Sequence, residues 1–255
     1  MQTRTFLLAL LALAMASPNP IPQETSIPEE PPTVEFPPIT ETVVPTTVPT
    51  ETAIWRHPDL IPTPKAPFPI YNFSSTVTPE NLDLRRNGQL LVSDLTGPFL
   101  YQLDPTQGPG QTVKVVHEFK GYSSTTGLVE LEEDVFALGV GNFTLADGPT
   151  RGTWKIWRID LRSKHTVRVE PLVSAPDAMI LGEITAINAS AGLLAATDYV
   201  QGTLWLLDLL NNRTTPIITS PELATTTVGS GGDIGFNGLK YRNGRLYFQV
   251  TTTGL

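Results

Sequence analysis

The chain has 255 residues, a formal net charge of −8 at pH 7 and no cysteine. The lack of cysteine excludes disulfides, zinc–thiolate sites and cysteine nucleophiles. The acidic charge, with no run of basic residues, argues against binding to nucleic acid or to an anionic membrane surface.

The N-terminal part predicts export. Residues 1–16 combine a short basic start with an apolar run that ends at Ala14-Met15-Ala16, which is typical of a secretory signal peptide. The run is too short to span a bilayer, and no later stretch is long and apolar enough. We therefore expect a protein that is secreted or held in the lumen of the secretory pathway, without a membrane span.

Residues 17–52 differ in composition from the rest of the chain. They hold ten of the 24 prolines, six glutamates and no lysine or arginine. Such a segment cannot bury enough apolar surface to offset chain entropy, so we expect disorder. Its Thr/Pro mixture suits either an O-glycosylated stalk or a passive linker.

Residues 53–255 contain an internal repeat. Three residues recur 104 positions later: Gly88, Asp94 and Asp104 at Gly192, Asp198 and Asp208. Gly244 follows Gly192 by 52 positions, half of that spacing. A repeat of this size made of short β runs is typical of a β-propeller blade, so we expect an all-β fold with at most a turn or two of helix.

The repeat divides the chain into an incomplete propeller of the six-bladed type, with about three and a half to four blades. The blades are expected at 80–119, 126–173 and 184–218, with two further strands from 238. Residues 66–73 read as an outer strand that closes the ring. Complete rings have about four to eight blades, so an oligomer or further blades are needed for closure.

Two other patterns are best explained by structure. The repeated aspartates follow strand ends, where Asp caps tight turns. The Gly-rich segment 229–235 precedes a strand and lacks a following Lys, so we expect a flexible inter-blade loop rather than a phosphate site. The histidines, His57, His117 and His165, lie in separate segments, and no G-x-S-x-G sequence is present.

Four N-x-S/T triplets accompany the export signal. With that signal they predict a glycoprotein. The acceptors are Asn72, Asn142, Asn188 and Asn212.

The candidate site lies where the innermost strand of each blade begins. The residues there are Glu80, Thr126, Glu183 and Asn237. Glu and Asn oxygens that converge on one axis could hold Ca²⁺ or a similar hard cation, or could simply line a wet channel. We leave both alternatives open, and no catalytic residue is assigned.

Several segments together resemble a known family. They are PENLDLRRNGQLLVSDL, YQLDP, GLVELEEDVFALGVGNFT, WKIWRIDL, LLAATDYVQGTLWLLD and GFNGLKYRNGRLYF. Over about 70–250 they resemble the SMP-30/gluconolactonase/LRE-like six-bladed propellers, in their fungal secreted branch.

The resemblance implies two kinds of chemistry. Lactonase members use a channel-bound divalent cation, Ca or Zn, for which Glu80 and Asn237 match two ligand positions. The middle Asn ligand falls near Gly182; Glu183, one residue on, could replace it or point into a strand hairpin.

The fungal branch also includes the hetero-Diels–Alderases of tropolonic sesquiterpenoid biosynthesis, which need no metal. This implies a cofactor-free cyclase of secondary metabolism that joins a quinone methide to a terpene, a small hydrophobic substrate. A metal-dependent lactonase is the alternative, and a non-catalytic or degenerate propeller the second alternative.

Overall fold

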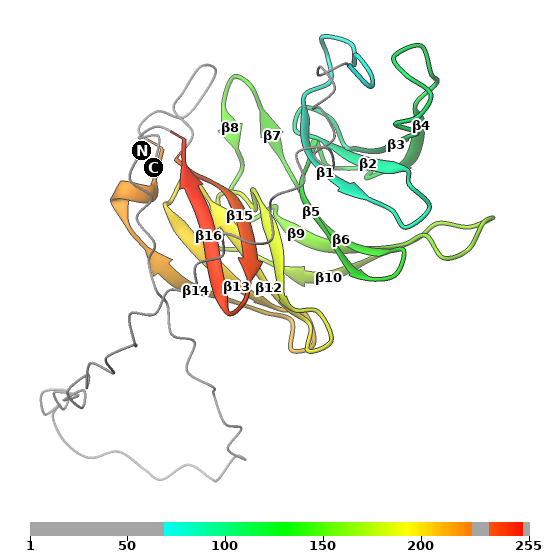
Figure 1. The fold of residues 1–255 in the computed structure, drawn as a ribbon. Helices are drawn as coiled ribbons and strands as arrows, with labels where there is room; N and C mark the ends of the chain where they lie inside the picture. The colour runs from blue at the N-terminus through cyan, green and yellow to red at the C-terminus, as the bar shows by residue number, and fades with distance from the viewer. Residues whose placement is uncertain (1–68, 226–234, 252–255) are drawn as a thin grey trace, which may run out of the picture. The chain divides into compact units, whose positions relative to one another are not determined.

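The computed structural model describes residues 69–225 and 235–251, and the colours of Figure 1 follow these ranges along the chain. Within them, strands dominate and helix is limited to one 3-10 turn at Pro221–Leu223. No helix in these ranges has the length and hydrophobicity that crossing a membrane requires. The predicted signal peptide, the Pro/Thr-rich segment, His57 and most of the Gly-rich loop lie outside the described residues.

Blade one is a four-stranded antiparallel meander in the order β1-β2-β3-β4. Its strands are β1 (Pro79–Leu84), β2 (Leu90–Asp94), β3 (Phe99–Leu103) and β4 (Lys114–Glu118). The short apolar runs of β2 and β3 bury Leu91 and Leu100 completely, whereas β4 is largely exposed. The sheet therefore has a buried centre and a solvent-facing outer strand, as expected for a blade.

Blade two has the strand order β10-β9-β6-β5. Its strands are β5 (Ser124–Glu132), β6 (Val135–Gly141), β9 (Lys155–Asp160) and β10 (Arg168–Ser174), and the small hairpin β7 (Phe143–Thr144) and β8 (Gly148–Pro149) is inserted between β6 and β9. Ser124 pairs with Gly141, so the hairpin leaves the sheet at the end where β5 begins.

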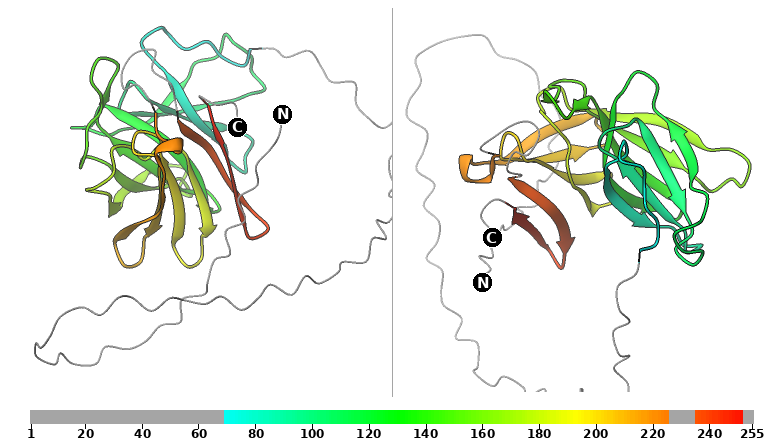
Figure 2. Two further views of the ribbon diagram at one scale, coloured as in Figure 1. Left: turned by 90° about the vertical axis from the view of Figure 1, so that its left-hand side faces the viewer. Right: turned by 90° about the horizontal axis from the view of Figure 1, so that it is seen from above.

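Blade three is again a meander, and two further strands follow it. Its strands are β11 (Ile184–Asn188), β12 (Leu193–Asp198), β13 (Thr203–Asp208) and β14 (Arg213–Thr219), followed by β15 (Phe236–Arg242) and β16 (Arg245–Val250). The β15–β16 ribbon lies beside blade three in all views of Figures 1 and 2.

The innermost strands form a continuous series. β1 contacts β5, β5 contacts β11, and β11 contacts β15. A separate hydrophobic cluster fills each junction: Leu91 with Phe136 between blades one and two, Ile184 with Trp154 between blades two and three, and Phe236 beyond blade three. Sheets that stack face to face through their inner strands are the arrangement of a β-propeller, so the fold predicted from the repeat is confirmed.

The repeated glycines occupy equivalent turns. Gly88, Gly192 and Gly244 each follow the first strand of a blade, with φ of +85°, +66° and +75°. Only glycine adopts this left-handed conformation without strain. Blade two has Asp134, with φ of 57°, in the corresponding turn. The prediction that the three glycines are equivalent is confirmed.

The repeated aspartates are structural, as the sequence pattern indicates. Asp94 Oδ1 accepts hydrogen bonds from the backbone N–H of Thr78 at 3.1 Å and of Thr96 at 3.0 Å. Asp198 Oδ2 accepts one from the N–H of Met179 at 2.8 Å, and Oδ1 accepts from its own turn. Each carboxylate therefore ties the end of a second strand to the segment that enters the first strand of the same blade.

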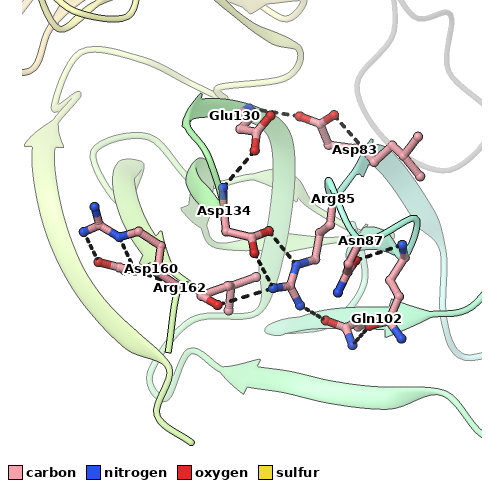
Figure 3. Close-up of polar contacts among 11 residues, drawn as sticks. Asp83, Arg85, Asn87, Gln102, Glu130, Asp134, Asp160 and Arg162 are labelled. Carbon is pink, nitrogen blue, oxygen red and sulfur yellow. Dashed lines mark hydrogen bonds and ion pairs between the residues drawn. The ribbon is translucent and has the colours of Figure 1, made fainter. Parts of the chain in front are cut away.

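A half-buried ion pair joins blades one and two at the turn end of the inner strands. The Arg85 guanidinium donates to both carboxylate oxygens of Asp134 at 2.9 Å, and to Gln102 at 2.7 Å, as Figure 3 shows. Beside it, Nη1 of Arg86 lies 2.6 Å from Oε2 of Glu133 in an exposed ion pair. Asp134 therefore has two roles: it occupies the turn between β5 and β6, and it pairs with Arg85 of the neighbouring blade.

The predicted closing strand is wrong for the part of 66–73 that the structure describes. Residues 69–73 form no strand. Pro69 has no N–H to donate to a ladder. Instead, Phe73 packs its ring against Tyr71 and Tyr101, with centroid distances of 4.9 and 5.4 Å. Aromatic contacts with blade one hold this segment in place of strand pairing.

Candidate functional site

The four residues predicted from the inner-strand starts lie at the starting ends of the innermost strands β1, β5, β11 and β15. We call this group of residues the central site. Glu80 is the second residue of β1, Thr126 the third of β5, and Asn237 the second of β15, while Glu183 directly precedes β11. Contacts between blades tie these segments together. The Thr126 hydroxyl donates to the Leu181 carbonyl at 2.5 Å.

Glu80 has an unusual environment. Its Oε2 atom is buried and has no hydrogen-bond partner. Burial raises the pKa of Glu80 to about 8, and the charge of Glu183 contributes to the rise. A carboxyl group in such a place holds its proton at neutral pH and becomes a hydrogen-bond donor. Glu80 is therefore a neutral acid whose Oε2 atom has no partner among the described residues.

Glu183 is a carboxylate with a counter-charge. Its Oε1 lies 3.0 Å from Nζ of Lys240 on β15, and its side chain is 13% exposed, against 71% for the lysine. Its backbone is fixed by Thr197, which accepts from the Glu183 N–H through Oγ1 at 2.9 Å and donates its own N–H back at 3.0 Å. Of the two orientations left open by the sequence, the structure shows the Glu183 side chain directed to β15.

The other two candidates have different surroundings. Thr126 is fully buried, and its hydroxyl is used on the Leu181 carbonyl and, at 3.4 Å, on that of Gly139. Asn237 is half-buried and faces Gln249 across the β15–β16 pair. Among the described residues, no hydrogen bond or ion pair links Asn237 to the other three. Within the central site, the charge of Glu183 acts on Glu80, whereas Asn237 has no such link to the other three residues in the described ranges.

The sequence analysis missed two residues of this site, Tyr199 and Lys240. An ideal Cβ built on Gly182 would lie 3.3 Å from Cδ1 of Tyr199 and 3.0 Å from Oγ1 of Thr197. Burial, then the charges of Glu80 and Asp198, raise the pKa of Tyr199. The repeat offered one signal for Tyr199. This tyrosine directly follows the repeated Asp198, whereas the equivalent position in blade one, after Asp94, is Leu95.

The donor set does not fit a resident metal ion. Gly182, where the family resemblance implies a middle ligand, has no side chain, and Glu183 is paired with Lys240. No three His, Cys, Asp or Glu side chains within the described ranges are grouped so that they could hold a metal. A hard cation requires several oxygen ligands, and Glu80 with Asn237 supplies too few.

The remaining predicted positions lie away from the central site. Asn72, Asn188 and Asn212 are exposed, whereas Asn142 is half-buried and accepts from the Ser123 N–H at 3.2 Å. His165 is exposed. The His117 ring packs against Phe119 at 4.7 Å, and burial lowers its pKa. Neither histidine contacts the site residues.

Comparison with known proteins gives a fold-level likeness only. No family profile matches the chain, and no curated protein does. Among solved structures, the chain is similar to a gluconolactonase from Xanthomonas campestris described as important in glucose secondary metabolic pathways. Identity is 14% and the TM-score 0.44, with 71% of this chain matched. The matched part spans 57% of that protein's chain.

Proposed function

We propose that this protein is a cofactor-free enzyme of secondary metabolism, a hetero-Diels–Alderase-type cyclase that joins a quinone methide to a terpene. The observation that carries the proposal is the buried, unpartnered Oε2 of Glu80. A free proton donor in a water-poor place suits a substrate with a carbonyl oxygen and few other polar groups. The same environment disfavours the charged carboxylate that a metal ion needs.

The chemistry needs no group beyond such a donor. In the cycloaddition, the exocyclic carbon and the carbonyl oxygen of the quinone methide each form a bond to one carbon of the terpene alkene. The π bonds reorganise, and no atom or proton is lost. A hydrogen bond from neutral Glu80 to the carbonyl oxygen would draw electron density from the diene and stabilise charge that develops on this oxygen. Holding the two partners together supplies the rest of the acceleration.

The charge balance around Glu80 supports this role. Lys240 pairs with Glu183, so the carboxylate whose charge acts on Glu80 is partly neutralised. Without that pair, the uncompensated charge would push Glu80 still further towards its protonated state and would oppose the negative charge that develops on the quinone methide oxygen. The central site therefore combines a neutral donor with a compensated charge.

A second candidate, a divalent-metal lactonase, is favoured by one observation: Glu80 and Asn237 are both second residues of innermost strands. One experiment distinguishes the cyclase from the lactonase. The purified chain is mixed with a preformed quinone methide and a polyene terpene, and separately with an aldonolactone, each with EDTA or with added Ca²⁺ or Zn²⁺. Cyclised product unaffected by EDTA supports the cyclase. Metal-dependent lactone hydrolysis would overturn it in favour of the lactonase.

Variants of Glu80 sharpen the distinction. Glu80→Gln keeps a neutral hydrogen-bond donor, so a cyclase should lose less than about threefold in rate. Glu80→Leu removes the donor and should lose about tenfold or more, as expected for a hydrogen bond worth 1–1.5 kcal/mol. A metal ligand or a general base would instead be lost in both variants. No turnover of either substrate by any variant or by the unsubstituted chain would support the non-catalytic alternative.

A further inference from the structure

We propose that the outer face of the β15–β16 ribbon binds an acidic saccharide, a sugar that carries carboxylate groups. The outer face is defined by the exposed side chains that point away from blade three: Lys240, Arg242, Arg245, Tyr247 and Gln249. The inference does not rest on the proposed cyclase function, and the variants that test it lie outside the central site.

Strand alternation separates this face from the core. Leu246 and Phe248 of β16 pack on the hydrophobic cluster next to blade three. Successive side chains of a strand point to opposite faces, so Arg245, Tyr247 and Gln249 point away from that cluster and are exposed. The right-hand view of Figure 2 shows no other strand on that side of the ribbon.

Two arginines lie directly opposite each other on the outer face. Arg242 pairs with Arg245 across the ladder, beside the turn Asn243-Gly244, and both side chains are exposed. Neither guanidinium forms an ion pair with any residue that the structure describes. Like charges directly opposite each other in a β ladder are destabilising. An anion bound between them would remove this repulsion, and planar guanidinium groups match the two oxygens of a carboxylate.

The same turn sequence elsewhere in the chain shows what such an arginine binds. Arg86 precedes Asn87-Gly88 in the first turn of blade one, as Arg242 precedes Asn243-Gly244 in the ribbon. Nη1 of Arg86 lies 2.6 Å from a carboxylate oxygen of Glu133 in the neighbouring blade. The ribbon arginine has no such carboxylate within the described ranges, so a carboxylate from outside them is the matching ligand.

The neutral groups beside the arginines favour a sugar as the carrier of that carboxylate. Tyr247 is 46% exposed, and its ring offers an apolar surface to the C–H face of a sugar while its hydroxyl can bond sugar oxygens. The Gln249 side chain runs along Gly238, 3.4 Å from an ideal Cβ there, and its amide can bond further hydroxyls. Arg245 and Gln249 are about 13 Å apart along β16, a length that a short oligosaccharide can cover.

The local charge differs from that of the whole chain. The chain carries a formal charge of −8, whereas the outer face carries three cations, of which only Lys240 has a counter-charge among the described residues, Glu183. The acidic remainder of the protein repels a long polyanion, so a short saccharide with few carboxylates fits better than a nucleic acid strand. No run of basic residues reveals this face in the sequence, because strand pairing brings its cations together.

Binding of trigalacturonate tests the proposal. The control probes are maltotriose, a trisaccharide without carboxylates, and triglutamate, a peptide with carboxylates but no sugar ring. In calorimetric titrations at low salt, the unsubstituted chain should bind trigalacturonate about tenfold more tightly than either control probe, given the charge-assisted and aromatic contacts. Arg242→Gln combined with Arg245→Gln should weaken trigalacturonate binding about tenfold, and Tyr247→Ala about threefold.

The matched control removes two exposed positive charges from blade two. Arg151→Gln combined with Arg168→Gln should leave the affinity for trigalacturonate within about twofold. Without ligand, Arg245→Gln should raise the melting temperature at low salt, since it ends the repulsion from Arg242, and high salt should abolish this gain. The proposal would be overturned by no binding, by equal losses in the two double variants, by equal affinity for either control probe, or by a lower melting temperature of Arg245→Gln.

Discussion

Gly127 on β5 and Gly182 before β11 meet backbone to backbone. An ideal Cβ on Gly127 would lie 2.7 Å from the amide nitrogen of Ile184, and closer still to the carbonyl oxygen of Gly182. Real Cβ atoms do not come so near to fixed backbone. The contact sets how closely blades two and three approach and, through the next residue, where Glu183 stands.

Gly127→Ala should therefore destabilise the fold strongly. The added methyl group meets backbone rather than a movable side chain, so we expect a loss of about 2–4 kcal/mol, at or above the usual cost of overpacking. Urea unfolding followed by tryptophan fluorescence measures it. Gly110→Ala is the matched control, since nothing lies within 4 Å of its Cβ, and it should stay within about 0.5 kcal/mol. Equal effects of both substitutions would contradict the tight contact.

Stability should fall as the pH rises through the titration range of Glu80. Its pKa is raised from 4.5 to about 8 in the fold, so the folded state binds this proton more tightly than the unfolded state. The stabilisation of the fold by this proton is fully present below pH 4.5 and is lost as the pH rises towards 8. Its upper limit is on the order of 4–5 kcal/mol of unfolding free energy. The charge of Glu183, which is paired with Lys240, adds to the rise.

The Glu80→Gln variant isolates this effect. It should lack the decline in unfolding free energy between pH 5 and 8, while sharing the loss at low pH that comes from Asp160, whose pKa is lowered to about 2 by Arg162. Parallel pH curves for both proteins would show that the Glu80 carboxyl is not desolvated in solution.

The two neighbouring ion pairs of blades one and two should differ in energy. Arg85 and Asp134 have side chains that are 11% and 22% exposed, whereas Arg86 and Glu133 are 73% and 63% exposed. A double-mutant cycle with Arg85→Met and Asp134→Asn should give a coupling of about 1.5–3 kcal/mol, given the bidentate geometry in Figure 3. The cycle for the exposed pair should give less than 1 kcal/mol. The reverse order would contradict the inter-blade role.

Asp198 should be more costly to remove than Asp208, although both are repeat residues. Asp198 is fully buried and accepts from four backbone N–H groups, including that of Met179. Asp208 serves mainly Asn211 in an exposed turn. We expect about 3 kcal/mol for Asp198→Ala and about 1 kcal/mol for Asp208→Ala in thermal unfolding. Comparable losses would mean that the burial of Asp198 has no energetic consequence.

The repeat made the fold predictable because its signals are local. A glycine that needs positive φ, such as Gly192, and an aspartate that caps its own turn, such as Asp198, are visible in any copy of the unit. Glu80 could be selected in the same way, from its place at a strand start. Its pKa could not, because that depends on burial by other blades.

Contacts between blades could not be predicted from local sequence signals. Lys240 and Tyr199 lie far from Glu80 in the sequence, and the repeat, although it marks the position of Tyr199, does not show that either residue acts on Glu80. The expected strand at 66–73 failed for a related reason. Its composition allows a strand, but a strand also needs a free sheet edge, and the aromatic rings of Tyr71 and Phe73 find Tyr101 instead.

The β7–β8 hairpin offers a place to attach a reporter. Its base is fixed by Ser123, whose hydroxyl donates to the Phe143 carbonyl at 2.9 Å and accepts from the Phe143 N–H at 3.0 Å, while the tip residue Ala146 is exposed. The chain has no cysteine, so Ala146→Cys would introduce a single thiol. A dye on that thiol would sit at the end of blade two where β5 begins and could signal ligand entry without any label in the core.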